Sequence, residues 1–279
     1  MLEKGTLYVC ATPIGNLGDI TLRVLDTLRQ ADLVAAEDTR HSRKLLQYYD
    51  IHTPLTSYHE HNEKSKAREL VDKLKAGQTV ALISDAGLPG ISDPGFAVIQ
   101  LCQAENIQVD VLPGANAAVT ALVLSGMPAD SFAFQGFLPA QRRERKKVLA
   151  AWVQLTITQI FYEAPHRLLT TLEDMAEIWG DRQGAVVREL TKIHQTVHRG
   201  RLQELVEEFR RIPAKGECCL VLAPYVPVKA VADPAQWHRE VDAAVASGMP
   251  KQQAIKEVAR RYGVGKREVY QALLDPETI

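Results

Sequence analysis

Three loops rich in glycine, proline and short polar side chains each follow a short apolar segment. They are residues 11–19 (ATPIGNLGD), 84–95 (SDAGLPGISDPG) and 113–117 (PGANA). In open α/β sheets, ligands bind outside the carboxyl ends of the strands, and glycine lets backbone amides approach a ligand closely. A single loop of this kind could have a purely structural role as a turn, because Asp93-Pro94 and Asn116 are good helix caps. Three such loops together predict a binding cleft.

The polar residues of these loops narrow the class of ligand. The sequence has no GxGxxG after its first apolar segment and no GxxxxGK[ST], so the usual cradles for a dinucleotide or a triphosphate are missing. The loops hold Asp85 and Asn116 where a polyphosphate site would hold lysines. This pattern favours a cationic or zwitterionic ligand, of which S-adenosylmethionine is an example.

Short apolar segments alternate with longer segments of helical period through the first half of the chain. The segments that predict strands are Leu7–Ala11, Leu33–Ala36, Leu55–Tyr58, Val80–Ile83 and Val109–Leu112. Between them, apolar residues recur at helical spacing, as at Leu22, Leu25 and Leu28. The alternation is typical of crossover connections and a mostly parallel sheet.

A second block follows the basic run 142–147. Its predicted strands are Thr158–Tyr162, Ala185–Arg188, Thr196–Arg199 and Cys218–Ala223. The last of these lie close together in sequence, so we expect a mixed or largely antiparallel sheet. Three prolines in residues 224–234 predict a linker, and the remainder is predicted to be helical. We therefore expect an N-terminal α/β domain (1–122), a second α/β domain (123–226) and a helical tail (227–279).

The charge balance excludes a uniformly basic protein that binds nucleic acid over its whole surface. Lysine and arginine total 33 against 34 acidic residues, so the 279-residue chain is not uniformly basic. Local concentrations remain, and we expect them to contact RNA because clustered cations bind a phosphate backbone. The expected contacts are Arg142, Arg143, Arg145, Lys146, Lys147, Arg260, Arg261, Lys266 and Arg267.

Each basic concentration also has a structural interpretation. The run 142–147 could be a solvated helix face. The tail has the spacing of a helix-turn-helix, with Ala259 where helices approach closely and Gly263 in the turn, and it could equally be a packed cap or a dimer contact.

Metal and membrane sites are not predicted. The four cysteines lack the spacing of a zinc ribbon or a redox CxxC, and we expect free thiols. His194 and His198 lie four residues apart in a predicted strand, where this spacing favours structural or RNA-facing histidines over metal ligands. No apolar run approaches the ~20 residues of a membrane span, and residues 1–5 are polar, so we expect a cytoplasmic protein.

Five stretches share their residues with a known family. They are residues 12–19 (TPIGNLGD), 36–40 (AEDTR), 84–95, 161–167 (FYEAPHR) and 188–192 (RELTK). In colinear order they resemble the ribosomal RNA small subunit methyltransferase I family, the ribosomal RNA branch of the tetrapyrrole methylase superfamily. The resemblance implies a tetrapyrrole methylase-like two-domain fold and a homodimer that uses S-adenosylmethionine. It also implies methylation of the ribose 2′-hydroxyl of a cytidine in 16S rRNA, within the small ribosomal subunit.

The same resemblance implies which residues hold the cofactor. These are Pro13, Ser84, Asp85, Leu88, Asn116, Ala117, Glu163 and Leu190, the last through its backbone. The first loop departs from the Gly-x-Gly-Pro-Gly-Asp form of the porphyrin and corrin methylases, in which this loop faces the substrate. That departure disfavours a tetrapyrrole substrate and a carbon methylation. A non-catalytic nucleic-acid-binding regulator is a further alternative, but it would not account for the three glycine-rich loops.

A ribose hydroxyl is a poor nucleophile near neutral pH, so a nearby proton acceptor should assist the reaction by ~10²–10⁴-fold. Acidic residues of the motifs that could serve are Asp19, Glu37, Asp38, Asp85, Glu163 and Glu189, with His166 and Lys192 as proton partners. We favour Glu37, Asp38 and Arg40, which directly follow a strand, together with Lys192. The alternative for Asp38 and Arg40 is a surface ion pair of little consequence for stability.

Overall fold

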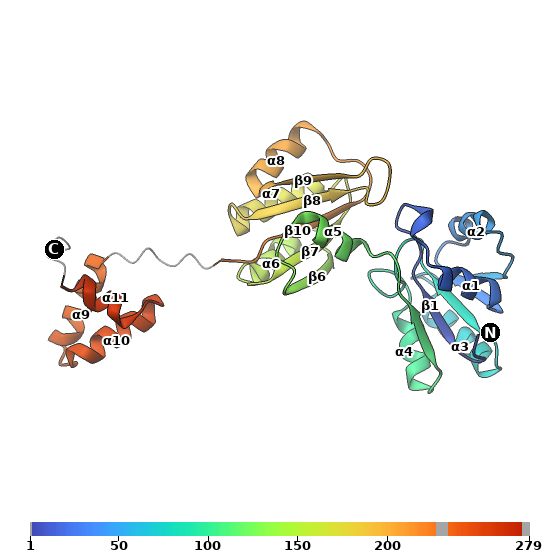
Figure 1. Cartoon of the computed structure of the whole chain (residues 1–279), viewed down its shortest axis with the longest axis horizontal. Coiled ribbons are helices and arrows are strands. Elements are labelled where there is room, and N and C mark those ends of the chain that lie inside the picture. Colours follow the sequence, from blue (N-terminus) through green and yellow to red (C-terminus); the bar gives the residue numbers. More distant parts are fainter. Residues whose placement is uncertain (1, 227–233, 275–279) are drawn as a thin grey trace. The chain divides into compact units, whose positions relative to one another are not determined.

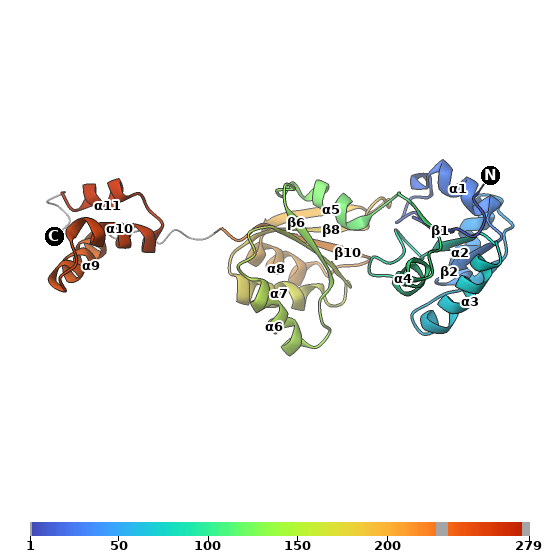
Figure 2. The same ribbon diagram turned by 90° about the horizontal axis from the view of Figure 1, so that it is seen from below.

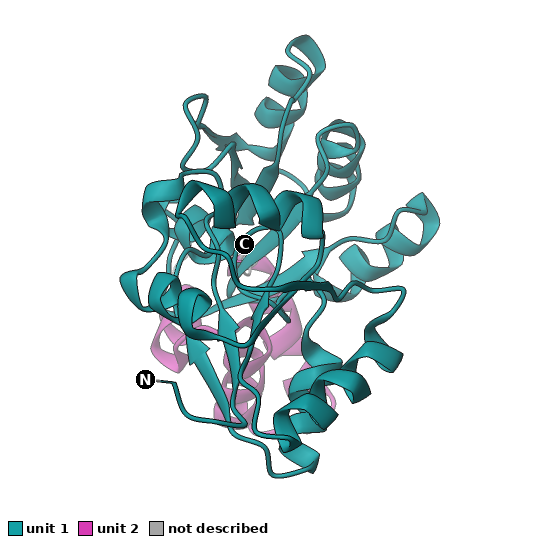
Figure 3. Cartoon of the chain, turned by 90° about the vertical axis from the view of Figure 1, so that its right-hand side faces the viewer, with its two compact units in different colours: residues 1–225 teal, residues 226–279 magenta. Residues whose placement is uncertain are grey.

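The computed structural model describes residues 2–226 and 234–274. The chain divides into two compact units, with the boundary between residues 225 and 226 (Figure 3). The first unit contains two five-stranded sheets with their helices, and the second is helical. The α/β class and the helical tail are confirmed.

The first sheet is parallel throughout, as predicted. Its strands are β1 (Leu7–Cys10), β2 (Leu33–Ala36), β3 (Leu55–Ser57), β4 (Val80–Ile83) and β5 (Val109–Leu112). They lie in the order β3-β2-β4-β1-β5. All four residues of β1 and all four of β4 are buried, as expected for strands that are covered on both faces.

Four helices cover this sheet, two on each face. They are α1 (Leu22–Gln30), α2 (Thr39–Tyr48), α3 (Glu63–Lys75) and α4 (Phe96–Ala104). Apolar side chains of α1 and α2 form one core layer, and those of α3 and α4 form the layer on the opposite face (Figure 1). A short 3-10 helix, η1 (Leu17–Asp19), lies in the loop after β1.

The second sheet is mixed, which confirms the prediction. Its strands are β6 (Phe132–Phe137), β7 (Thr158–Glu163), β8 (Gln183–Arg188), β9 (Thr196–Arg201) and β10 (Cys218–Leu222), in the order β6-β7-β10-β8-β9. β6 pairs in parallel with β7, and the other pairs are antiparallel. The sequence did not predict β6, whose residues are only half-buried or exposed and whose register shifts before Phe137.

Helices cover both faces of the second sheet as well. The helices α6 (Arg142–Trp152), α7 (Leu168–Trp179) and α8 (Leu202–Arg211) lie over one face, and α5 (Ala117–Ser125) lies over the other (Figure 2). Because α5 packs on the second sheet, the proposed domain boundary after residue 122 falls inside this helix. The core layer under α5 also takes in Ile14, from the loop after β1. The two sheets are thus joined by apolar packing next to the first glycine-rich loop.

The tail contains α9 (Pro234–Ala246), α10 (Lys251–Tyr262) and α11 (Lys266–Ala272). Gly263 ends α10 in the left-handed region, at φ 63°, as the predicted turn between two helices requires. The three helices pack around Trp237, Val241, Ile255, Val258 and Val269. Residues 227–233 of the predicted linker lie outside the described residues.

No helix in the described part of the chain is long and apolar enough to cross a membrane. Within the same residues, no group of three histidine, cysteine or acidic side chains could hold a metal ion. His198 instead contacts Glu208, with 2.7 Å between its Nδ1 and a carboxylate oxygen. The four cysteines are free and buried, as expected.

Candidate functional site

The carboxyl ends of β1 and β4 form a crevice in the first sheet. The connection from β1 runs through α1 on one face, whereas the connection from β4 runs through α4 on the opposite face. The two loops that follow these adjacent strands therefore diverge, and such a switch point is where open α/β sheets bind ligands. Thr12 and Gly87 hold the loops together, with N–H···O distances of 2.8 and 3.1 Å.

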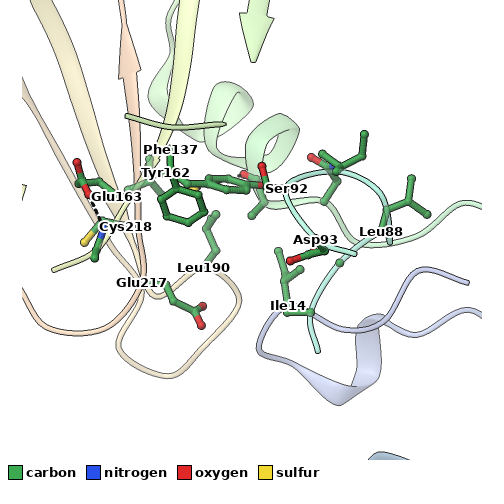
Figure 4. Close-up of a pocket in the computed structure, with 18 of the residues that line it drawn as sticks. Ile14, Leu88, Ser92, Asp93, Phe137, Tyr162, Glu163, Leu190, Glu217 and Cys218 are labelled. Carbon is green, nitrogen blue, oxygen red and sulfur yellow. Dashed lines mark hydrogen bonds between the residues drawn. The ribbon is translucent and has the colours of Figure 1, made fainter. Parts of the chain in front are cut away.

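A pocket of about 350 Å³ opens at this crevice, within the size range of small-molecule sites. Both halves of the first unit contribute to it. Figure 4 shows Ile14, Leu88 and Asp93 approaching from the first half, opposite Tyr162, Leu190 and Glu217 from the second. A ligand in this pocket would contact both halves.

Gly15 permits a close approach between two loops at the edge of the pocket. A Cβ atom at this position would lie 2.5 Å from Cγ of Lys192 and 2.8 Å from the carbonyl oxygen of Leu190. The facing loop is itself constrained, because Glu189 and Thr191 adopt positive φ angles of 51° and 63°. Strained backbone of this kind persists only where its surroundings over-determine it. The contact fixes Leu190 beside the pocket.

One wall of the pocket is aromatic. The ring of Tyr162 packs edge to face against Phe137 and Phe134, with centroid distances of 5.6 and 4.7 Å. Burial raises the pKa of the Tyr162 phenol to about 12, so this residue stays neutral. Ile14, Val187 and Leu190 add aliphatic surface. The pocket therefore suits a ligand with a flat, apolar part.

The charged lining is acidic. Among the described residues that line the pocket are Asp93, Glu163 and Glu217, and none of the lining residues is a lysine, arginine or histidine. Glu163 is buried against Arg167 at 3.4 Å and accepts a hydrogen bond from Thr171. Glu217 forms an ion pair with Lys192 at 3.0 Å. Both carboxylates are thus neutralised by neighbours.

Asp93 is the exception. Within the described part of the chain no lysine, arginine or histidine forms an ion pair with it, and its hydrogen-bond partner is the Ser84 side chain. Burial, followed by the nearby carboxylate of Glu37, raises the pKa of Asp93 to about 7. Burial also raises the pKa of Glu37. The pocket therefore holds a carboxyl group that titrates near neutral pH, which is a property of functional sites.

The predicted cofactor residues fall into two groups. Leu88, Asn116, Ala117, Glu163 and Leu190 line the pocket. The other three, Pro13, Ser84 and Asp85, are not among the lining residues. The carbonyl oxygen of Ser84 accepts a hydrogen bond from the Thr12 hydroxyl at 3.1 Å. Asp85 accepts one from the backbone N–H of Asp38 at 3.2 Å.

The predicted catalytic residues surround the pocket without lining it. Glu37 accepts a hydrogen bond from the Asp85 backbone at 3.4 Å, so it supports the loop after β4. Asp38 caps α2 through the N–H of Arg40 at 2.7 Å, which holds the pKa of Asp38 below its usual range. Arg40 is exposed, and Lys192 contacts the pocket through Glu217. None of these four residues is among the described lining residues, so their catalytic roles stay predictions.

The basic run on α6 is largely occupied by internal ion pairs. Arg142 and Arg145 both contact the fully buried Asp174, at 2.7 and 2.8 Å. Lys146 pairs with Glu177, and Lys147 with Glu144. Arg145 is itself buried, with a side-chain exposure of 4%, so it has no surface to offer RNA. The expected RNA contact at Arg145 is therefore replaced by a role in packing α6 on α7.

The cations of the tail are more available. Arg260, Lys266 and Arg267 are exposed. Arg261 differs because it forms an ion pair with Glu240 of α9 at 2.7 Å. Glu240 also accepts a hydrogen bond from Tyr262, so this carboxylate ties α9 to the end of α10.

Several lining residues were not predicted from the sequence. Tyr162 and Asp93 lie inside motifs that were recognised, but nothing in one sequence distinguishes them from their neighbours. Phe137 ends the unpredicted strand β6. Cys218 begins β10 and Glu217 directly precedes this strand. The pairing of β10 with β7 and β8 brings both residues to the pocket.

Comparisons with known proteins agree with this geometry. Residues 6–206 match the family model described as Tetrapyrrole (Corrin/Porphyrin) Methylases. Two curated proteins named "Ribosomal RNA small subunit methyltransferase I" are similar over nearly the whole chain. The one from Halalkalibacterium halodurans is 47% identical, covering 96% of this chain and 94% of the relative. The one from Synechocystis is 46% identical, covering 98% and 99%.

Solved structures share the fold. A uroporphyrin-III-C-methyltransferase from Thermus thermophilus aligns with a TM-score of 0.54 at 21% identity, covering 78% of this chain and 94% of that one. A diphthine synthase aligns with a TM-score of 0.62 at 15% identity, covering 78% and 89%. At these identities the likeness concerns the fold alone.

Proposed function

Since this chain belongs to the ribosomal RNA small subunit methyltransferase I family, within the tetrapyrrole methylases, we propose that it methylates the ribose 2′-hydroxyl of a cytidine in 16S rRNA. The methyl donor is S-adenosylmethionine. The observation that carries the proposal is the pocket at the β1/β4 switch point, which is acidic and partly aromatic and has no cationic residue among its described lining. A tetrapyrrole carbon methylase and a non-catalytic regulator are not favoured by the names of the relatives.

The residues present fit S-adenosylmethionine. This cofactor carries a sulfonium and an ammonium group, and the described lining of the pocket is acidic and holds no cation. The aromatic wall at Tyr162 and the aliphatic side chains opposite it suit an adenine ring. Asn116, which caps α5, and Leu190, in the loop after β8, also line the pocket. A polyphosphate would find no cation in the described lining.

When bound, S-adenosylmethionine supplies a methyl group that its sulfonium has already activated for displacement. The protein must align the ribose oxygen with this group and accept a proton. We assign the proton to the Asp93 carboxylate. With the cofactor bound, Asp93 would accept the proton of the ribose hydroxyl. Burial and then the nearby carboxylate of Glu37 raise the pKa of Asp93 to about 7, so it would accept this proton at neutral pH.

We also propose the substrate, the oligomeric state and the cellular location of the enzyme. The substrate is 16S rRNA within the small ribosomal subunit, and the enzyme acts as a cytoplasmic homodimer. Exposed apolar residues on α5 support an interface between copies, because Val119 and Val123 have exposed fractions of 48% and 73%. Sedimentation of the purified chain tests this part. A single monomer peak at micromolar concentration would contradict it.

Labelled methyl transfer tests the proposed reaction. The chain is incubated with tritiated S-adenosylmethionine and one of three acceptors: isolated 16S rRNA, small subunits that lack the modification, or a porphyrin. We expect label in the RNA of the subunits. Label in the porphyrin alone would establish the alternative. Calorimetric binding of S-adenosylmethionine without transfer to any acceptor would contradict the proposed reaction.

A further inference from the structure

Helix α2 has an unusual charge composition. Its sequence is TRHSRKLLQY, with Arg40, Arg43 and Lys44 and no acidic residue. Every other helix in the described residues that carries three or more lysines and arginines also carries an acidic residue, such as Glu144 on α6 or Glu257 on α10. The charge of α2 is therefore not balanced within the helix.

The cations of α2 face solvent. Ser42 and Leu46 are the buried residues that attach the helix to the first sheet. Arg43 and Lys44 are exposed, and neither has an ion-pair partner among the described residues. Arg40 is 90% exposed and lies 3.9 Å from Asp38, a loose contact of little energetic weight. Four of the five cations of α6 have ion-pair partners, whereas all three cations of α2 remain available to an external anion.

The basic face of α2 begins next to the pocket. The loop after β4 contributes Ala86 to the pocket lining. The preceding residue, Asp85, accepts a hydrogen bond from the backbone of Asp38, the residue that caps α2. The Asp85 backbone in turn donates to Glu37. Two hydrogen bonds therefore fix the start of α2 to the pocket wall.

An RNA substrate carries phosphate charges that no residue of the described pocket lining can neutralise. A ribose that enters the pocket brings phosphates on both sides, and the described pocket lining has no lysine or arginine to receive them. Their charge must be met by cations just outside the pocket. Arginine is suited to this because its planar guanidinium binds phosphate oxygens in pairs.

We propose that the exposed basic face of α2, formed by Arg40, Arg43 and Lys44, binds the phosphate backbone of the RNA strand beside the nucleotide in the pocket. This inference rests on the proposed function and adds the surface that positions its substrate. Contacts to phosphate fix register and orientation and carry no sequence information. The face is therefore a positioning surface, and specificity for the target nucleotide comes from elsewhere.

The double variant Arg43→Gln/Lys44→Gln tests the inference and leaves Arg40 in place. Binding to small subunits that lack the modification is measured from about 0.05 to about 0.3 M salt. Loss of two phosphate contacts should weaken binding about tenfold at low salt and reduce the slope of log affinity against log salt by about 1.5. The affinity for S-adenosylmethionine and kcat at saturating subunits should not change.

A matched control is available on α3, which covers the opposite face of the first sheet. The variant Arg68→Gln/Lys73→Gln also removes one arginine and one lysine. It should bind subunits with the affinity and salt slope of the wild type. Equal effects of the two variants would overturn the inference, as would a fall in S-adenosylmethionine affinity of the α2 variant that accounts for its lost activity.

The wild-type protein separates this inference from the proposed function. If it fails to methylate the subunits at all, the proposed function is contradicted. If it methylates them and the α2 variant binds them like the control, only the role of α2 is contradicted. Melting temperatures of both variants should match that of the wild type, since all four side chains lie outside the core.

Discussion

Asp93 combines partial burial with the absence of a cationic partner among the described residues. In the mechanism that we propose, the charge of Asp93 controls the rate of methyl transfer. A protonated Asp93 cannot accept the hydroxyl proton. Below pH 7 the rate of methyl transfer should therefore fall about tenfold per pH unit. Asp93→Asn should lower kcat by about 10²-fold or more and abolish this pH dependence. Single-turnover rates between pH 5.5 and 8.5 check both expectations.

A control is needed because Asp93 could also contribute to binding the cofactor. Calorimetry should show that Asp93→Asn retains most of its affinity for S-adenosylmethionine. A variant that binds the cofactor normally and keeps the wild-type rate and pH profile would show that the proton goes elsewhere.

The same carboxyl group affects stability. Its pKa rises from the ordinary value of 3.8 to about 7 on folding, so the folded chain holds this proton more tightly than the unfolded chain. The stabilising contribution is complete below pH 3.8 and is lost as the pH rises to about 7. Asp93→Asn should therefore raise the melting temperature at pH 8 and change it less at pH 5. Calorimetric melts at the two pH values test this, and equal shifts would contradict the raised pKa.

At the residue scale, the sequence could identify loops but not rank the side chains inside them. The family resemblance implied Asn116 and Leu88, which lie in glycine-rich loops after strands, and both line the pocket. Glu37 follows a strand in the same way, yet its carboxylate is turned to the Asp85 backbone. Which side chain enters a pocket depends on loop conformation, and that is set by long-range contacts such as the pairing of Thr12 with Gly87.

At the scale of elements, the site depends on the contact between the loop after β1 and residues 189–192. Gly15→Ala would place a methyl group 2.5 Å from Cγ of Lys192 and displace Leu190. We expect an affinity for S-adenosylmethionine that is lower by about tenfold, since displacements of about 1 Å at a site are costly. The control is Gly77→Ala, at φ 85°, where a Cβ would meet nothing within 4 Å. It should lose stability through backbone strain but keep its affinity, and equal affinities of the two variants would contradict this role of Gly15.

The packing of α6 on α7 gives a second element-scale prediction. Asp174 is fully buried and contacts Arg142 and Arg145. Removing one partner from a buried ion pair leaves an uncompensated charge, so Asp174→Ala should lower the free energy of unfolding by about 3–5 kcal/mol. Glu177→Ala, at an exposed position, should cost less than about 1 kcal/mol. Urea titrations measure both, and similar losses would show that the run 142–147 is not structural.

These elements also show why strands were predicted more reliably than charge pairing. The strands of the first sheet are short continuous apolar runs, a pattern that a sequence displays directly. The run 142–147 displays only its own charges, because its partners lie about 30 residues away on α7. β6 was missed for a related reason, since a half-exposed edge strand lacks the apolar run of a buried one.

At the scale of the whole molecule, the chain is nearly neutral, but its acidic and basic side chains are concentrated in different places. The described pocket lining is acidic, while unpaired cations remain on α2 and at exposed positions of the tail, such as Lys266 and Arg267. Lys266→Gln/Arg267→Gln should weaken binding of small subunits by several-fold, with a smaller salt slope. Filter binding at several salt concentrations checks this. Unchanged binding would assign the tail to packing or dimer contact.

The central claim is that the chain methylates a ribose oxygen of RNA. The most direct measurement is nucleoside analysis of 16S rRNA after transfer of labelled methyl groups to small subunits that lack the modification. The account predicts that the label elutes as 2′-O-methylcytidine, and that Asp93→Asn yields the same nucleoside at a much lower rate. Label on a base, or on a ribose of another nucleotide, would contradict it.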